Sequence, residues 1–139
     1  MAAALAQVCV DPRLNHELLR VQLRQKLQGL RMMADRIYIL NDIGGNVGTN
    51  FRNTVNLLAS RQEPIVMCAV LHHDDCLSAQ QGIRTPLDDS AREMAAHLAD
   101  RNIRCPVLTG TIRIDNNHLL WSDEPEPRYE LIAFRMLRL

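Results

Sequence analysis

The sequence has few aromatic residues, no net charge and no long apolar run. Its 139 residues include 16 basic and 16 acidic side chains, and only 4% are aromatic. Nucleic-acid binding needs clustered Lys and Arg, commonly with stacking rings, so this composition argues against it. No apolar stretch approaches the ~20 residues of a membrane-spanning helix, and the apolar start is too short for a signal peptide. We therefore expect a cytoplasmic protein that binds neither nucleic acid nor membrane.

What is present fits an ordinary globular chain. Hydrophobic residues make up 47% and charged residues 23%, and the length fits a single domain over residues 1–139. The only Pro-rich stretch, Glu124–Pro127, reads as a linker, which makes residues 124–139 a C-terminal extension ending in a short element. Ile132 and Phe134 would otherwise expose apolar surface, so we expect this extension to dock.

Strand and helix patterns alternate along the chain. Apolar runs predict strands at 7–10, 36–40, 64–71 and 107–114. Between these strands, apolar residues at helical spacing predict three helices. Their apolar stripes are Leu19, Leu23, Leu27 and Leu30; Phe51, Val55 and Leu58; and Ala91, Met94, Ala95 and Leu98. Ser90 and Glu93 have capping-box spacing, and a polar turn at 115–117 predicts a returning strand at 118–121. The pattern predicts an α/β fold with a mostly parallel sheet of about four strands, an antiparallel edge strand and helices on both faces.

Chemically capable side chains follow the first and third strands. Cys9 lies at the end of the first, and His73 and Cys76 follow the third. Ligands of open α/β sheets bind outside the carboxyl ends of the strands, so these residues meet if the two strands are neighbours. Thiolate and imidazole are zinc ligands, and three protein ligands leave the fourth position to a reacting water. We therefore predict that Cys9, His73 and Cys76 bind one Zn²⁺.

Asp11 and Arg13 lie at two-residue steps from Cys9, so an extended chain points all three alike. Arg13 can hold the Asp11 carboxylate bidentately, which keeps Asp11 ionised and able to accept a proton from zinc-bound water. With Arg13 turned away, Asp11 could instead bind the zinc and close the site.

These motifs resemble those of the β-class carbonic anhydrases. The family carries Cys-x-Asp-x-Arg, here residues 9–13, and His-x-x-Cys, here residues 73–76, with a Gly-Gly turn between them, here Gly44-Gly45. The resemblance spans about residues 5–121 and marks the chain as a short, divergent member. It implies zinc-dependent hydration of carbon dioxide to bicarbonate by a metal-bound hydroxide, with Asp11 and Arg13 as the supporting dyad. It also implies a homodimer or a higher homo-oligomer.

Two other functions stay open. Leu77 stands where the family usually has Gly, and Ile43 where it has Ala, which could reshape the pocket. Relatives of this fold hydrolyse carbon disulfide or carbonyl sulfide with the same metal ligands. Alternatively, a chain that lacks the family's N-terminal helices could serve as a non-catalytic zinc-binding assembly module.

Other polar residues have structural interpretations. We expect Cys68 and Cys105 to be packing thiols. His72 and His16 are candidates for a proton relay by position, although a structural role is the simpler interpretation of His72 and a surface or cap role that of His16. The glycines at 44–48 could cradle a phosphate, although a structural turn is the simpler interpretation.

Overall fold

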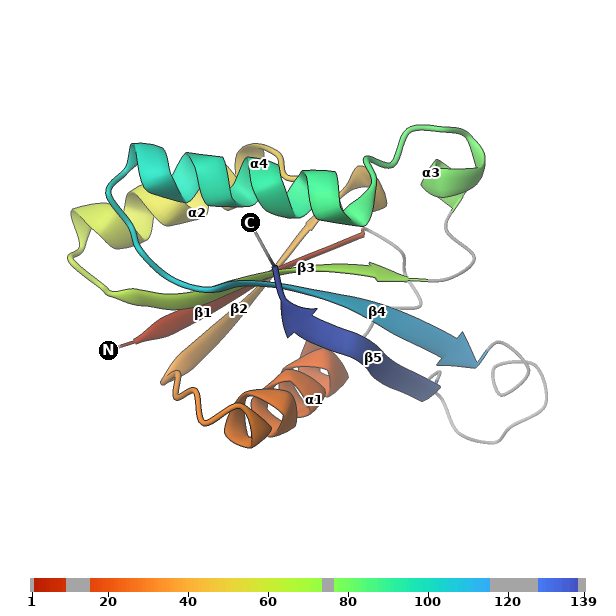
Figure 1. Cartoon of the computed structure of the whole chain (residues 1–139), viewed down its shortest axis with the longest axis horizontal. Coiled ribbons are helices and arrows are strands. Elements are labelled where there is room, and N and C mark those ends of the chain that lie inside the picture. The colour runs from red at the N-terminus through yellow and green to blue at the C-terminus, as the bar shows by residue number, and fades with distance from the viewer. Residues whose placement is uncertain (1, 10–15, 74–76, 116–127, 138–139) are drawn as a thin grey trace.

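The computed structural model describes residues 2–9, 16–73, 77–115 and 128–137 of the chain, and strands and helices alternate along it (Figure 1). The elements in chain order are β1 (Ala3–Cys9), α1 (His16–Gly29), β2 (Arg36–Asp42), the 3₁₀ turn η1 (Ile43–Gly45), α2 (Thr49–Ser60), β3 (Ile65–His73), α3 (Leu77–Gln80), α4 (Leu87–Asp100), β4 (Val107–Asp115) and β5 (Arg128–Met136). None of the helices in these ranges combines the length and apolarity that crossing a bilayer takes.

The five strands form one sheet in the order β2-β1-β3-β4-β5. The first four are parallel, and β5 pairs antiparallel with β4 at the edge. The predicted α/β fold class, with its mostly parallel sheet and antiparallel edge strand, is confirmed. The strand β1 has β2 on one side and β3 on the other, and every residue of β1 is buried.

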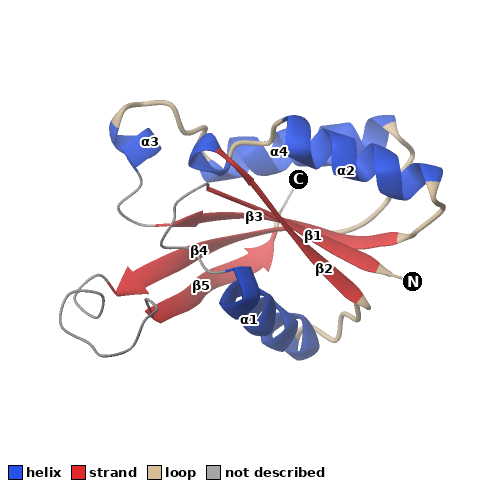
Figure 2. Ribbon diagram, turned by 180° about the vertical axis from the view of Figure 1, so that it is seen from behind, coloured by secondary structure: helices blue, strands red, loops and turns tan. Residues whose placement is uncertain are grey.

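Helices cover both faces of the sheet, as expected for apolar parallel strands. Figures 1 and 2 show α1 alone on one face and α2 with α4 on the other. The buried residues that each helix turns toward the sheet are Leu19, Leu23 and Leu27 in α1; Phe51, Val55 and Leu58 in α2; and Ser90, Ala91, Met94 and Leu98 in α4. The core therefore consists of two layers, one on each side of the sheet.

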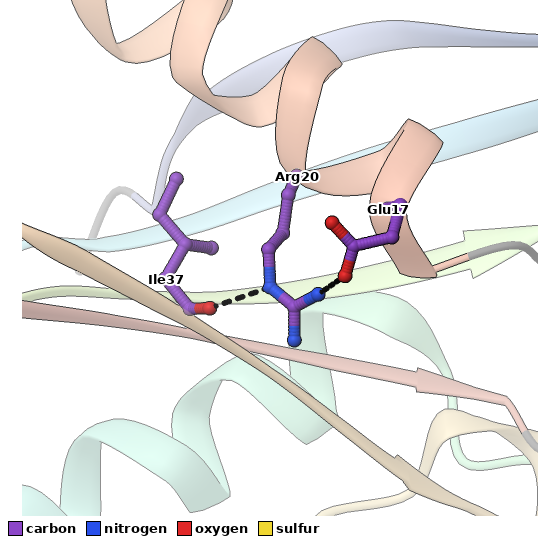
Figure 3. A network of polar contacts seen from close by, with 3 residues as sticks. All are labelled: Glu17, Arg20 and Ile37. Atoms are coloured by element: carbon purple, nitrogen blue, oxygen red, sulfur yellow. Dashed lines mark hydrogen bonds and ion pairs between the residues drawn. The ribbon is translucent and has the colours of Figure 1, made fainter.

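Polar contacts fix α1 on its face. The Arg20 Nε donates to the carbonyl oxygen of Ile37 on β2 at 2.9 Å, and its guanidinium pairs with Glu17 one turn earlier (Figure 3). The amide of Leu131 on β5 donates to the side-chain oxygen of Gln22 at 3.1 Å. One helix thus ties the β2 side of the sheet to the antiparallel edge.

Two sequence predictions about helix ends were wrong. The helix α4 begins at Leu87 after Pro86, so Ser90 is a fully buried residue of the helix and does not cap it. Proline is tolerated at a helix start because its missing N–H would have no partner there, which lets the helix begin before Ser90. Leu30 lies beyond the end of α1 and is 42% exposed, so it is not part of the apolar stripe.

The antiparallel partner of β4 comes later in the chain than predicted. The predicted strand at 118–121 lies outside the described residues, whereas β5 pairs with β4 over nearly its whole length. The amide of Leu137 also donates to the carbonyl oxygen of Val107 at 2.7 Å. The expected docking of the C-terminal segment therefore occurs on the sheet of its own chain, through a nine-residue strand.

Candidate metal centre

Cys9 and His73 are the last residues of two adjacent parallel strands. Cys9 ends β1 and His73 ends β3, and the two strands pair directly. The chain leaves β1 through α1 on one face and reaches β3 through α2 on the other, so the connections diverge at this point (Figure 2). Ligand sites of open α/β sheets occur where connections diverge in this way. The expectation that the first and third strands are neighbours is therefore met.

Both side chains are withdrawn from water, with 7% of Cys9 and 2% of His73 exposed. Cys9 packs in the buried layer between the sheet and α1. Counting by two along β3 places His73 on the same side as Ala69 and Leu71, which belong to that layer. His72 falls on the opposite side by the same count, with Cys68 and Val70 of the other layer.

The backbone of Gly45 braces the two strand ends against each other. A Cβ atom at this position would lie 3.4 Å from the amide nitrogen of Cys9 and 3.4 Å from the carbonyl oxygen of Leu71. Gly45 has φ +72°, a conformation that favours glycine. The Gly-Gly segment is thus a structural turn packed on the ends of β1 and β3, which agrees with the simpler of its two sequence interpretations.

Arg84 holds the end of β3 from the other side. Its Nη1 donates to the carbonyl oxygen of His73 at 3.0 Å. The same side chain lies against Gly44, where an added Cβ would come within 3.1 Å of the Arg84 Cβ. Sequence reasoning missed Arg84 because it belongs to the loop between α3 and α4 and no motif or periodicity marks it.

Asp42 is a second residue to which the sequence assigned no role. It is the register partner of Cys9 across β1 and β2. Its Oδ2 is buried without a hydrogen-bond partner among the described residues, and a Cβ on Gly48 would lie 2.7 Å from that oxygen. A carboxylate oxygen therefore lies on the strand next to Cys9 with its hydrogen-bonding capacity unused.

The other predicted site residues, Asp11, Arg13 and Cys76, lie outside the described residues. Within the described ranges no three metal-binding side chains come together. The two donors that are described fit zinc chemically, because a thiolate and an imidazole withdrawn from water are its usual protein ligands. The centre therefore needs Cys76, or another donor from those segments, to be complete.

The pKa of His72 is lowered to about 4, first by burial and then by the positive charge of Arg84 and by His73. This imidazole stays neutral at ordinary pH, which suits a structural role better than a proton relay near neutrality. The pKa of His16, the other relay candidate, is also lowered, chiefly by burial.

Cys68 and Cys105 pack in the layer on the α2 and α4 side, as predicted for packing thiols. A side-chain hydrogen bond with Cys105, together with burial, raises the pKa of Cys68 well above its usual value. The same bond lowers the pKa of the half-buried Cys105. Both cysteines lie away from the strand ends that carry Cys9 and His73.

No family model and no curated protein matches the sequence. Among solved structures, carbonic anhydrase from Streptococcus mutans is 17% identical over 97% of this chain and 81% of its own, with a TM-score of 0.49. Carbonic anhydrase from Glaciozyma antarctica is 15% identical over 78% and 75%, with a TM-score of 0.41. The apo form of a carbon disulfide hydrolase is 13% identical over 78% and 73%, with a TM-score of 0.46. The structural neighbours thus include carbonic anhydrases and a carbon disulfide hydrolase, and a likeness this distant does not assign the chain to either activity.

Proposed function

We propose that this protein is a zinc enzyme that hydrates carbon dioxide to bicarbonate. Its metal ligands would be Cys9, His73 and Cys76. The observation that supports the proposal is the placement of Cys9 and His73, two buried donors of the types zinc prefers, at the adjacent ends of β1 and β3. The order and spacing of the two motifs, which resemble those of the β-class carbonic anhydrases, add the third ligand and the reaction.

When bound, zinc supplies Lewis-acid activation of water near neutral pH. The residues of the chain have separate tasks. Cys9 binds through its sulfur and His73 through its imidazole, and Gly45 and Arg84 hold the two strand ends in place. Arg13 orients the Asp11 carboxylate, and Asp11 accepts the proton that leaves the attacking water.

Metal analysis combined with stopped-flow CO₂ hydration tests the proposal. The wild-type protein should carry about one zinc per chain and hydrate CO₂ faster than buffer. Cys9→Ser should lose both properties, because serine is a much weaker zinc ligand. Cys105→Ser is the matched control, since this thiol lies away from the strand ends, and it should keep zinc and activity. Full zinc loading with a rate equal to that of buffer would refute the proposed reaction.

The role of Asp11 needs a variant of its own. Asp11→Asn keeps the shape of the side chain and removes the proton acceptor, so it should retain zinc and lose most of the hydration rate, on the order of 10²-fold. Asp89→Asn on the exposed face of α4 is the control and should leave the rate unchanged. If Asp11 bound the zinc instead, its loss would raise the hydration rate.

The same zinc-loaded protein should be tested with carbon disulfide and carbonyl sulfide. If the protein hydrolyses either compound and does not hydrate CO₂, the proposed metal centre would stand and the proposed substrate would be replaced. Light scattering would test the predicted homodimer, which the motifs imply through their resemblance to the family.

A further inference from the structure

A cavity of about 410 Å³ opens beside the candidate metal centre, on the α4 side of the sheet. Its walls come from the end of β3, the middle of β4, the start of α4 and the loop before α4. The lining includes His72, His73, Arg84, Leu87 and Thr111. Among these, the side chains of His72, Arg84 and Thr111 can donate hydrogen bonds to a ligand, which is unusual for a hollow whose walls come from apolar strands.

His72 contributes a buried polar atom that lacks a partner. Its side chain is 5% exposed, it lines the cavity, and its Nε2 has no hydrogen-bond partner within the described ranges. Leaving such an atom unsatisfied costs about 1–3 kcal/mol, so a ligand that bonds to it is favoured. Thr111 is the register partner of His72 on β4, and its hydroxyl lies at the same wall.

Arg84 contributes a positive charge. One of its nitrogens donates to the His73 carbonyl oxygen, which anchors the planar group, and its other N–H groups have no hydrogen bond to any residue that the structure describes. Among the described residues no carboxylate forms an ion pair with Arg84. A partly buried guanidinium that pairs with no carboxylate in the described part of the chain, fixed at the wall of a cavity, favours an anion there.

The start of α4 adds to this potential. The helix has 14 residues, and its N-cap position, Pro86, makes no side-chain capping bond. The first N–H groups of a helix are unsatisfied and carry partial positive charge, which attracts anions. The acidic residues of this turn do not fill the site, since Asp89 pairs with Arg92 at 3.2 Å and Asp88 lines a separate cavity.

We propose that this cavity binds the oxyanion group of a small molecule through Arg84, His72 and Thr111. The ligand is a planar carboxylate or bicarbonate, or a tetrahedral phosphate, because both present oxygens to several converging donors. The candidate zinc ligand His73 also lines the cavity, but none of the three proposed donors is a proposed zinc ligand, so the proposal does not require bound zinc.

The test is a titration of metal-free, chelator-treated protein with inorganic phosphate, bicarbonate and acetate in separate arms, followed by NMR at the ring of His72. We expect saturable binding in at least one arm. Arg84→Gln should weaken it at least about tenfold, and Thr111→Val about threefold, as the loss of a charged and of a neutral hydrogen bond. Arg61→Gln removes an equal charge from the end of α2 and should leave the affinity unchanged.

Phosphate binding alone would assign a tetrahedral ligand, and binding of bicarbonate or acetate a planar one. If Arg84→Gln fails to fold, the affinity of Thr111→Val decides whether the oxyanion binds in this cavity. No saturation in any arm, equal affinity in Thr111→Val and wild type, or equal weakening by Arg61→Gln would overturn the proposal. Cys9→Ser separates the two proposals, because it should abolish zinc binding and leave oxyanion binding intact.

Discussion

The guanidinium of Arg84 donates a hydrogen bond to the carbonyl oxygen of His73 across 3.0 Å. Eleven residues separate the two in sequence, and the bond ties the last residue of β3 to the loop before α4. The same arginine covers Gly44, so one side chain links the strand end that carries a candidate ligand to the turn that braces Cys9. The geometry of the candidate centre therefore depends on a residue that does not itself bind metal.

Replacing Arg84 tests this link. Arg84→Ala removes a charged, partly buried hydrogen bond and its packing, and should lower the free energy of unfolding by about 1–2 kcal/mol. Urea denaturation measures the change. Arg113→Ala is the control, because Arg113 is exposed and its 3.3 Å ion pair with Glu130 should contribute at most ~0.5 kcal/mol. Equal losses in the two variants would contradict the anchoring role of Arg84.

Alanine substitutions at two glycines with the same φ distinguish the stability cost of the backbone conformation from the cost of contacts made by the new methyl group. Gly45 and Gly82 both have φ +72°, but only Gly45 has atoms within 4 Å of an added Cβ. Gly82→Ala should cost about 1 kcal/mol, the conformational penalty alone. Gly45→Ala should cost about the same and leave zinc binding unchanged, because the new methyl group would meet the backbone of Cys9 and Leu71 at 3.4 Å, an ordinary van der Waals distance. Thermal unfolding and zinc titration of both variants measure these effects.

Removing the metal should leave the protein folded. The two core layers lie on the faces of the sheet, and Cys9 is the one proposed zinc ligand in a layer whose other buried members are aliphatic side chains and methionine. We expect chelator-treated protein to keep its far-UV circular dichroism and a cooperative unfolding transition, with a lower midpoint because zinc binds the folded state. Unfolding on chelation, as in small zinc fingers, would mean that the core does not support the fold alone.

Acid should destabilise the metal-free protein through His72. Its folded-state pKa of about 4 lies below the usual value of 6.5, so the unfolded chain takes up the proton first as the pH falls. Stability is therefore complete above about pH 6.5 and is lost progressively towards pH 4, by roughly 2 to 3 kcal/mol from this residue. The urea midpoint followed against pH should fall over this window, and less steeply in His72→Gln. Parallel profiles would contradict the assignment.

Thiol reactivity should distinguish the paired cysteines. The hydrogen bond from Cys68 lowers the pKa of Cys105 and raises that of Cys68. Iodoacetamide should therefore label Cys105 well before Cys68, since the thiolate is the nucleophile and Cys68 is fully buried. Peptide mapping by mass spectrometry gives the order. In Cys68→Ala the labelling of Cys105 should slow, because its thiolate loses the donor that stabilises it.

The fold could be predicted because β1 and β3 are apolar almost throughout and the helices between them show clear spacing. Local turn signals were less reliable. The polar residues at 115–117 predicted a tight turn followed directly by the returning strand. In the structure the segment around Leu131 pairs with β4 instead. The longer connection is tolerated because closing a longer loop costs little extra entropy. Ser90 has the spacing of a helix N-cap, but the helix begins earlier because Pro86 allows it to start at Leu87.

The candidate site was accessible to sequence reasoning only in part. Cys9 and His73 could be placed because strand ends and strand order follow from pattern and topology. Arg84 could not, since it acts through a hydrogen bond to a backbone carbonyl that no sequence interval encodes. The buried oxygen of Asp42 could not either, because its burial depends on how the chain folds back at Gly48. Such residues emerge only when distant segments are brought together.

The interior position of β1 also has a consequence for synthesis. This strand precedes both of its neighbours in the chain, and its partner β3 is complete only at residue 73. Until then the segment Ala3–Cys9 of a nascent chain, which is apolar except for Gln7, can pair with β2 at one edge while its other edge lacks its partner strand. Such non-local pairing slows folding and exposes the chain to aggregation, so expression at lower temperature or with a holdase should raise the yield of native protein.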